Sequence, residues 1–400
     1  MAINVGVGTS KNSDARLAAS EAYRAAIMRS GADHADVVIA FSSPSYDQTE
    51  FVRSIREVSG GAPLFGCSDA GEITNDGPMK RSAAVMVIAS DSVRFHTGLG
   101  LAVAKGAREA GRAAAQTVRN EAREPIRVFA MLPDVLAGSG SEIVAGALEV
   151  LGPHFPVVGG APGDDFLFEK TWVYSNDAVE SGAVSALGMA GKFSFGVGVG
   201  HGWIPLGMPL TVTRSVGPVL YELDGKPALS VYEEYFGRSA DELRKETLAR
   251  IAITYPIGLH MPEYPDQYLI RDPLRADAQG AITCTGDVPE GSKVRIMIGS
   301  RKHAMEAARS AAEHVMQDLA EDHAHPKFVL MFNSVAREKL YGRKANDEIQ
   351  TVLGVIGRDI PLIGFYTYGE LAPIGGEVRD TNRCNSSFHN ETVVLFAVGE

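Results

Sequence analysis

The stretch Leu64-Phe65-Gly66-Cys67-Ser68-Asp69-Ala70-Gly71-Glu72-Ile73 is an apolar strand that runs into a polar, glycine-flanked turn. Similar stretches occur at residues 155–165 and 360–371. Equivalent points lie about 90 residues apart between the first two copies and about 200 between the second and third. Strand and helix patterns recur in the same order around each copy. The sequence therefore predicts an α/β protein with mixed sheets covered by helices, built from about three internal β-α-β-α-β-β repeats.

The copies divide the chain into two expected domains. Residues 1–212 hold two repeats, 1–90 and 91–190, and residues 213–400 hold an inserted segment followed by the third repeat, 292–400. The apolar strand pattern at 293–299 is expected to open that third repeat, and a polar helix is predicted over 239–250 within the insertion.

Composition limits the function classes. The chain has 400 residues, of which 45% are hydrophobic, and a net charge of -11. This balance is typical of a folded protein and disfavours nucleic acid and anionic membranes as partners. Three cysteines without paired spacing indicate neither a disulfide framework nor a four-thiolate zinc site, and no secretory signal is visible. We therefore expect a cytoplasmic protein.

The turns after the repeated strands are candidate ligand-binding loops, because α/β sheets bind ligands at the carboxyl ends of their strands. The carboxylates of Glu72 and Glu370 suit an amine or other hydrogen-bond donors, and Ser68 and Tyr366 lie on the same loops. The alternative is that these residues only build and cap the hairpin turns. Asp164 follows a Pro-Gly pair, a pattern typical both of a turn and of a cation-binding carboxylate.

Two further positions carry reactive side chains. Cys67 is a possible nucleophile at a strand-to-turn junction, but an isolated cysteine is more often a small buried apolar residue. His201, beside Trp203 and between two glycines, suits a metal or haem ligand, although a packed core histidine is the commoner outcome. No metal-ligand spacing, dinucleotide fingerprint or phosphate-binding loop motif is present.

Five motifs in order together resemble the FIST family of sensory proteins. They are the stretch at 64–73, His-Gly-Trp-Ile-Pro-Leu-Gly at 201–207, Leu-Tyr-Glu-Leu-Asp-Gly-Lys-Pro-Ala at 220–228, Gly-Phe-Tyr-Thr-Tyr-Gly-Glu at 364–370 and Phe-His-Asn-Glu-Thr at 388–392. The resemblance implies a module of signal transduction that binds small molecules such as amino acids, and some bacterial members bind haem and sense nitric oxide.

Matching positions carry the family's candidate ligand residues onto this chain. They are Cys67, Ser68, Glu72, His201, Trp203, Arg337, Tyr366, Glu370 and Asn390. Asp164, from its own sequence context, and Ser334, which departs from the family, complete the candidate ligand residues. Ser334 stands where relatives often have a cysteine, which weakens a redox or metal role there. Arg337 is retained and is expected to pair with a ligand carboxylate.

The sequence thus predicts a stand-alone cytoplasmic small-ligand sensor that is not an enzyme. Its ligand is expected to be an amino acid or related metabolite, and its signal is expected to pass to a separate output protein such as a histidine kinase or a cyclic-dinucleotide enzyme. Three alternatives stay open: a haem-binding nitric-oxide sensor that uses a histidine such as His201, an enzyme that uses Cys67, and a protein-interaction scaffold.

Overall fold

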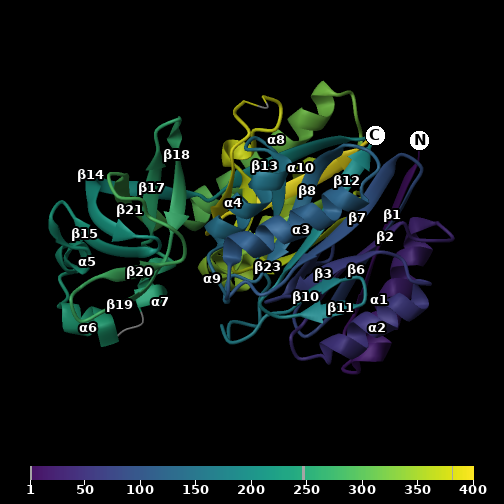
Figure 1. The fold of residues 1–400 in the computed structure, drawn as a ribbon, viewed down its shortest axis with the longest axis horizontal. Helices are drawn as coiled ribbons and strands as arrows, with labels where there is room; N and C mark the ends of the chain where they lie inside the picture. The colour runs from purple at the N-terminus through teal and green to yellow at the C-terminus, as the bar shows by residue number, and fades with distance from the viewer. Residues whose placement is uncertain (1, 246–247, 381) are drawn as a thin grey trace.

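The chain forms three six-stranded mixed α/β units and a separate eight-stranded domain at one end of the molecule (Figure 1). The computed structural model describes residues 2–245, 248–380 and 382–400. In each unit the second and third strands of the repeat are parallel, and the first and last strands are antiparallel to their neighbours. The predicted mixed α/β class is confirmed.

The first sheet has the order β1-β6-β2-β3-β10-β11, and helices α1 and α2 cover it. Its elements are β1 (Ile3–Ser10), α1 (Ala15–Ser30), β2 (Val37–Ser42), α2 (Gln48–Val58), β3 (Leu64–Ser68), β6 (Ala83–Ser90), β10 (Val173–Ser175) and β11 (Ala178–Glu180). Both helices begin at an aspartate whose side chain accepts a backbone N–H of the first turn, Asp14 in α1 and Asp47 in α2.

The second sheet has the order β25-β24-β9-β8-β12-β7, and α3 and α4 cover it. Its elements are β7 (Val93–Gly100), α3 (Ala107–Glu121), β8 (Ile126–Pro133), α4 (Gly140–Leu151), β9 (Val157–Gly160), β12 (Val184–Gly191), β24 (Glu370–Pro373) and β25 (Ser386–His389).

The third sheet has the order β13-β26-β22-β23-β4-β5. Its elements are β13 (Ser194–Gly200), α8 (Arg301–Glu321), β22 (Pro326–Ser334), α9 (Val335–Tyr341), the short 3-10 turn Gly342–Lys344, α10 (Ala345–Ile356), β23 (Leu362–Thr367), β26 (Val393–Gly399), β4 (Glu72–Thr74) and β5 (Gly77–Pro78).

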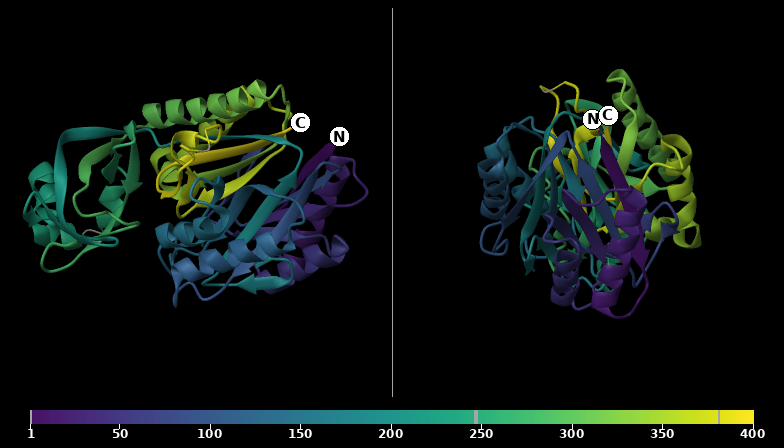
Figure 2. Two further views of the ribbon diagram at one scale, coloured as in Figure 1. Left: turned by 45° about the horizontal axis from the view of Figure 1, so that its top comes forward. Right: turned by 90° about the vertical axis from the view of Figure 1, so that its right-hand side faces the viewer.

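Each unit lends its hairpin strands to a neighbour, which closes the three units into a ring. The first unit sends β4 and β5 into the third sheet, the third sends β24 and β25 into the second, and the second sends β10 and β11 into the first. Inner faces of all three sheets share one apolar core, and the helices lie outside it (Figure 2). This exchange brings the turns that follow β3, β9 and β23 together.

The same strand register occurs in all three units. Gly66 lies opposite Ala40, Gly159 opposite Met131 and Gly364 opposite Met331. A Cβ atom on any of these glycines would lie 1.9–2.0 Å from the carbonyl oxygen of the residue opposite. These glycines therefore repeat because the strands approach too closely for a side chain.

The strand predicted to open the third repeat belongs to another sheet. Residues 293–299 form β21 (Lys293–Gly299), which pairs with β14 and β17. The opening strand is β13 instead, where a Cβ on Gly198 would lie 1.9 Å from the Ala311 carbonyl of α8, as a Cβ on Gly8 would lie 2.1 Å from that of Ala22. The insertion therefore separates the first strand of the third unit from its helix.

The inserted segment folds around a core of its own. Its elements are β14 (Trp203–Val216), β15 (Val219–Leu223), β16 (Lys226–Pro227), α5 (Leu229–Phe236), α6 (Ala240–Lys245), α7 (Leu248–Ala252), β17 (Ile257–Met261), β18 (Tyr264–Arg271), β19 (Pro273–Ala276), β20 (Ile282–Cys284) and β21. The helix predicted over 239–250 corresponds to α6 and α7, and its residues 246–247 lie outside the described part of the chain. Among the described residues, no helix is long and apolar enough to cross a membrane.

Candidate ligand site

The first unit's strand-to-turn junction carries two buried carboxyl groups, those of Asp69 and Glu72. The chain leaves β3 at Ser68 and enters the third sheet as β4. Two backbone bonds to Tyr366 guide this crossing: Ala70 N donates to Tyr366 O at 3.4 Å, and Tyr366 N donates to Gly71 O at 2.9 Å. Gly71 has φ +133°, a conformation that L side chains rarely adopt. The turn therefore holds both carboxyl groups inside the protein.

Each of these carboxyl groups has one partnered and one unpartnered oxygen. Gly71 N donates to Asp69 Oδ1 at 2.8 Å, and Ser82 Oγ donates to Glu72 Oε2 at 2.5 Å. Asp69 Oδ2 and Glu72 Oε1 have no hydrogen-bond partner within the described residues. Burial, the larger cause, raises the pKa of Asp69 well above its usual value, and the neighbouring Glu72 adds to this. Burial likewise raises the pKa of Glu72 to about 7.

The third unit carries an equivalent glutamate, Glu370, and both of its carboxylate oxygens have hydrogen-bond partners. Thr367 and Glu370 follow Gly364 at the spacing with which Asp69 and Glu72 follow Gly66. Thr367 Oγ1 donates to Glu370 Oε1 at 2.5 Å, and Thr392 donates to Oε2 from its N at 3.0 Å and its Oγ1 at 2.7 Å. Burial raises the pKa of Glu370 to about 8.

The second unit lacks the pair altogether. In the strand that the second unit lends to the first sheet, Val173 lies opposite Cys67, as Glu72 lies opposite Phe365 and Glu370 opposite Gly160. The strand register also places Ala183 where the first unit has Ser82, since Asp134 N donates to Ala183 O as Ser43 N donates to Ser82 O. Of the three equivalent junctions, the first therefore leaves unpartnered acceptor oxygens.

Residues 161–172 form a loop over this junction. Ser68 Oγ donates to Gly163 O at 2.8 Å and accepts from Trp172 N at 3.0 Å, so Ser68 fixes both ends of the loop. Asp165 N donates to Asp69 O at 3.4 Å. Burial raises the pKa of the Asp165 carboxyl, which lies 3.5 Å from Ser43 Oγ.

Asp164 holds the loop in shape. Its carboxylate accepts the backbone N–H groups of Phe168, Glu169 and Lys170 at 2.7–2.9 Å and the Tyr368 hydroxyl at 2.5 Å. Because the protein engages both of its carboxylate oxygens, Asp164 organises the loop. Neither oxygen is left free for the predicted ligand contact.

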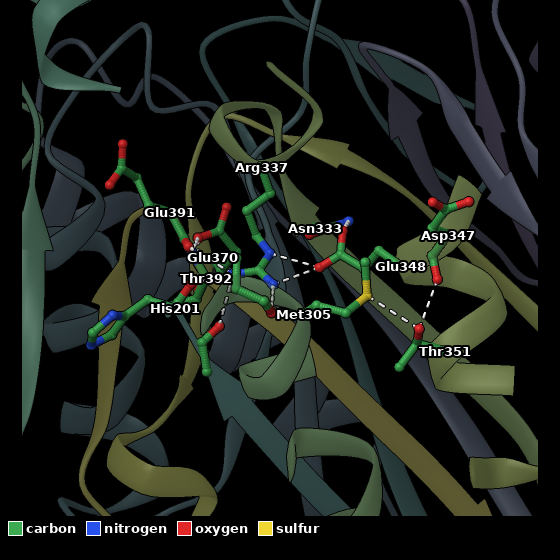
Figure 3. Close-up of polar contacts among 12 residues, drawn as sticks. His201, Met305, Asn333, Arg337, Asp347, Glu348, Thr351, Glu370, Glu391 and Thr392 are labelled. Atoms are coloured by element: carbon green, nitrogen blue, oxygen red, sulfur yellow. Dashed lines mark hydrogen bonds and ion pairs between the residues drawn. The ribbon is translucent and has the colours of Figure 1, made fainter. Parts of the chain in front are cut away.

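Arg337, predicted to pair with a ligand carboxylate, instead donates its hydrogen bonds to groups of the protein (Figure 3). Its side chain is fully buried, and Nε and Nη2 donate to Glu348 Oε1 at 2.9 and 2.5 Å. Nη2 also donates to Ala304 O at 2.7 Å, and Nη1 donates to His201 O. The guanidinium has five N–H donors; these four bonds use four of them, and Nη1 also lies 3.5 Å from the backbone oxygens of Gly200 and Glu391. Arg337 therefore joins α8, α9 and α10 to the entry of the inserted domain.

His201 does not fit an axial haem ligand. Trp203 N donates to His201 Nδ1 at 2.9 Å, so Nδ1 holds the lone pair and the ring proton lies on Nε2. An iron ligand needs a free lone pair on one ring nitrogen, but Nε2 carries the proton and the Nδ1 lone pair is engaged by Trp203 N. Burial lowers the pKa of His201 to about 4, which keeps the ring neutral. Trp203 packs against Ile270 and Met297 and donates through Nε1 to Ile253 O at 3.1 Å.

The remaining predicted residues take structural positions. Cys67 is buried in the shared core, and burial raises the pKa of its thiol well above the usual value, the opposite of an activated nucleophile. Ser334 Oγ accepts from Ala336 N at the start of α9, and Asn390 Oδ1 accepts from Thr285 Oγ1 at 2.8 Å. The described residues contain no group of three or more His, Cys, Asp or Glu side chains suited to a metal ion.

The structure thus brings Ser68, Glu72 and the Asp164 loop together at the first junction and places Arg337, His201 and Ser334 in a separate cluster. Sequence reasoning missed Asp69 and Ser82 as candidate ligand residues, whereas Asp165 follows Asp164 in the Pro-Gly-Asp-Asp stretch that it had considered. Asp69 lies within the repeated motif, and its replacement by Thr367 in the third copy was the available signal. Ser82 reaches the site only through the fold.

Profile comparison identifies the family. Residues 36–226 match the FIST N domain and residues 228–373 match the FIST C domain. The protein therefore belongs to the FIST family, and its role lies in sensing and signal transduction. The resemblance stated from the motifs is confirmed.

Relatives and solved structures extend the comparison. An uncharacterized protein of Mycobacterium tuberculosis strain H37Rv is 27% identical over 390 residues, which cover 94% of this chain and 96% of the relative. An uncharacterized protein of Methanocaldococcus jannaschii is 39% identical over 90 residues, 22% of this chain and 17% of the relative. A chorismatase crystal structure aligns over 100% of both chains with a TM-score of 0.40 and 9% identity. A cyanuric acid hydrolase from A. caulinodans aligns over 99% of both with a TM-score of 0.33 and 8% identity. Neither structural similarity is close enough to argue from.

Proposed function

We propose that this protein is a small-ligand sensor whose ligand carries an amine, as an amino acid or a related metabolite does, and that the amine binds between Asp69 and Glu72. The observation that carries this proposal is the pair of buried, unpartnered oxygens, Asp69 Oδ2 and Glu72 Oε1. Leaving a buried acceptor unpaired costs about 1–3 kcal/mol, and more when the group is charged.

An ammonium group matches this site because it has three N–H donors and no acceptor. Two carboxyl groups of one sign, buried side by side, are destabilised unless protons or a cation neutralise them. A bound amine supplies both the donors and the charge. Serine and backbone donors already satisfy the other two oxygens, so the free pair faces the ligand.

The loop over the site is the element that we propose to transmit binding. Asp165, Phe166 and Phe168 have φ between +55° and +68°, a costly conformation for residues other than glycine. Leu167 and Phe168 expose 64% and 56% of their surface on the outer side of the same loop. A rearrangement at Asp165 would change the apolar surface offered to a separate output protein, such as a histidine kinase or a cyclic-dinucleotide enzyme.

We further propose a binding role and no catalysis for this site. Cys67 lies in a setting that suppresses the thiolate, and the Ser82 hydroxyl beside Glu72 is itself fully buried. The experiment is a thermal-shift screen of amino acids and primary amines in amine-free buffer. A ligand at 100 times its Kd adds about 2.7 kcal/mol of stability, so an absence of any stabilising compound contradicts the proposal.

A further inference from the structure

A second group of unpartnered carboxyl oxygens lies where the inserted domain meets the third unit. Two contacts define this junction: Arg271 Nη1 donates to Phe388 O at 3.2 Å, and Thr285 Oγ1 donates to Asn390 Oδ1 at 2.8 Å. Asp272 follows Arg271 on the inserted domain, and Glu391 follows Asn390 on the third unit. The two carboxyl groups lie close enough to share a hydrogen bond through one proton, and no other described residue donates a hydrogen bond to the facing oxygens.

When both are ionised, these two groups offer acceptors but no donor. Glu391 is 0% exposed, and neither of its carboxylate oxygens has a partner in the described part of the chain. Asp272 Oδ1 is unpartnered as well. Figure 3 shows the Glu391 carboxylate projecting away from the Arg337 guanidinium. The backbone of Glu391 has φ +59°, an unfavourable value for a glutamate. The junction therefore holds Glu391 in place at some energetic cost.

The nearby cations do not neutralise this pair. Arg271 donates to the backbone carbonyls of Ile270, Asp287 and Phe388. Arg337 is engaged by Glu348, as described above. Glu370 adds a third acidic group that acts on Glu391. Two positive and four negative side chains thus share the region. Burial raises the pKa of Asp272 to about 7 and that of Glu391 well above its usual value, as expected for carboxyl groups without a counter-ion.

We propose that the Asp272–Glu391 junction binds an ammonium group, either free ammonium or the head of a primary alkylamine, which clamps the inserted domain to the third unit. Once it has lost its shared proton, the pair offers three acceptor oxygens that no other described residue engages, and these match the three N–H donors of an –NH3+ group. A hard divalent metal ion prefers six or more oxygen ligands, which the three do not supply. This site shares no residue with the Asp69–Glu72 site and does not depend on it.

The test uses the Asp69→Thr variant as background, because we expect this substitution to weaken amine binding at the first site by at least about tenfold. Methylammonium is added in sodium phosphate at pH 8, and tetramethylammonium, which has the same charge but no N–H donor, is the matched control. We expect methylammonium to raise the unfolding midpoint with saturation, and tetramethylammonium to leave it unchanged. Adding Asp272→Asn or Glu391→Gln should raise the Kd by about tenfold or more.

A direct readout comes from 15N-labelled ammonium, because a buried ammonium ion exchanges its protons slowly enough to give a bound 1H–15N signal. We expect this signal in the Asp69→Thr protein and its loss in Asp69→Thr/Asp272→Asn. If acidification alone stabilises the junction and ammonium has no effect, a shared proton holds the pair and the proposal is overturned. If only the Asp69–Glu72 site responds to amines, this inference fails while the proposed function stands.

Discussion

Thr367 in the third unit occupies the position that Asp69 occupies in the first, and this exchange determines whether the neighbouring glutamate is satisfied. Thr367 Oγ1 donates to Glu370, whereas the Asp69 carboxyl has no N–H or O–H to donate to Glu72 when ionised. The same fold therefore contains a closed version and an open version of one polar site. The closed version is an internal control for the open one.

Asp69→Thr should convert the first junction into the third-unit type. The new hydroxyl can donate to Glu72 and removes one of two like charges, so we expect the free energy of unfolding to be unchanged or raised by about 1 kcal/mol. Amine binding should fall by at least about tenfold, since one ionised acceptor is lost. Urea unfolding and calorimetric titration measure the two effects. A variant that binds amines as the parent does would remove Asp69 from the site.

Glu370→Ala should destabilise the protein more than Glu72→Ala. Glu370 accepts three hydrogen bonds from Thr367 and Thr392, and truncation leaves these donors unpaired at about 1–3 kcal/mol each in the worst case. Glu72 accepts a side-chain bond from Ser82 and has an open oxygen. Parallel urea titrations of the two variants test the order, and equal losses would show that the two glutamates are not differently satisfied.

The pH dependence follows from the raised pKa of Glu72. A carboxyl group whose folded pKa of about 7 exceeds its unfolded value of about 4.3 is protonated in the folded protein between those values. The stability that this raised pKa contributes is fully present below the unfolded pKa and is lost as the pH rises through the folded pKa of about 7. Amine binding favours the ionised form, so affinity should increase from pH 6 to pH 8 with proton release. Titrations in buffers of different ionisation enthalpy detect that release, which Glu72→Gln should reduce to the contribution of Asp69.

Arg337→Lys should destabilise the fold without changing ligand affinity. Lysine cannot reproduce the Nε and Nη2 bonds to Glu348 together with the bonds to Ala304 and His201. Breaking a buried ion pair costs about 3–5 kcal/mol. The measurements are urea unfolding and amine titration of the folded fraction. A selective loss of ligand affinity at full stability would restore Arg337 to the binding site.

Two glycine-to-alanine substitutions distinguish a glycine required by close backbone packing from a glycine that only lowers helix propensity. A Cβ on Gly198 would lie 1.9 Å from the Ala311 carbonyl, so Gly198→Ala should cost about 1–3 kcal/mol or prevent folding. Gly354 lies within α10 with nothing inside 4 Å of the added atom, and Gly354→Ala should stabilise by about 0.5–1 kcal/mol. Thermal unfolding of both proteins provides the comparison, and similar effects would argue against the packing explanation.

Local patterns predicted the mixed α/β class, because strands and alanine-rich helices alternate along the chain. They misplaced the opening strand of the third unit, since β21 and β13 are both apolar and the pairing that separates them is a long-range choice. The exchange of hairpins between units has no local signature, and neither have the tertiary contacts that bring Ser82 to Glu72 and Thr392 to Glu370.

The candidate site was predicted only in part, because local patterns do not show long-range contacts. Ser68 and Glu72 lie on the repeated motif and reach the junction as expected. Arg337 was misjudged because its partner, Glu348, lies on a different helix and approaches only through tertiary packing. Asp69 was overlooked because its significance comes from a comparison with Thr367, where a hydroxyl replaces a carboxyl.

Calorimetric titration of a primary amine identified by the thermal-shift screen into the parent protein and into Asp69→Thr at pH 8 tests the central claim most directly. We predict saturable binding to the parent and a Kd at least about tenfold higher in the variant, at equal or greater stability. Equal affinity in the two proteins would contradict the assignment of the ligand's amine to Asp69 and Glu72.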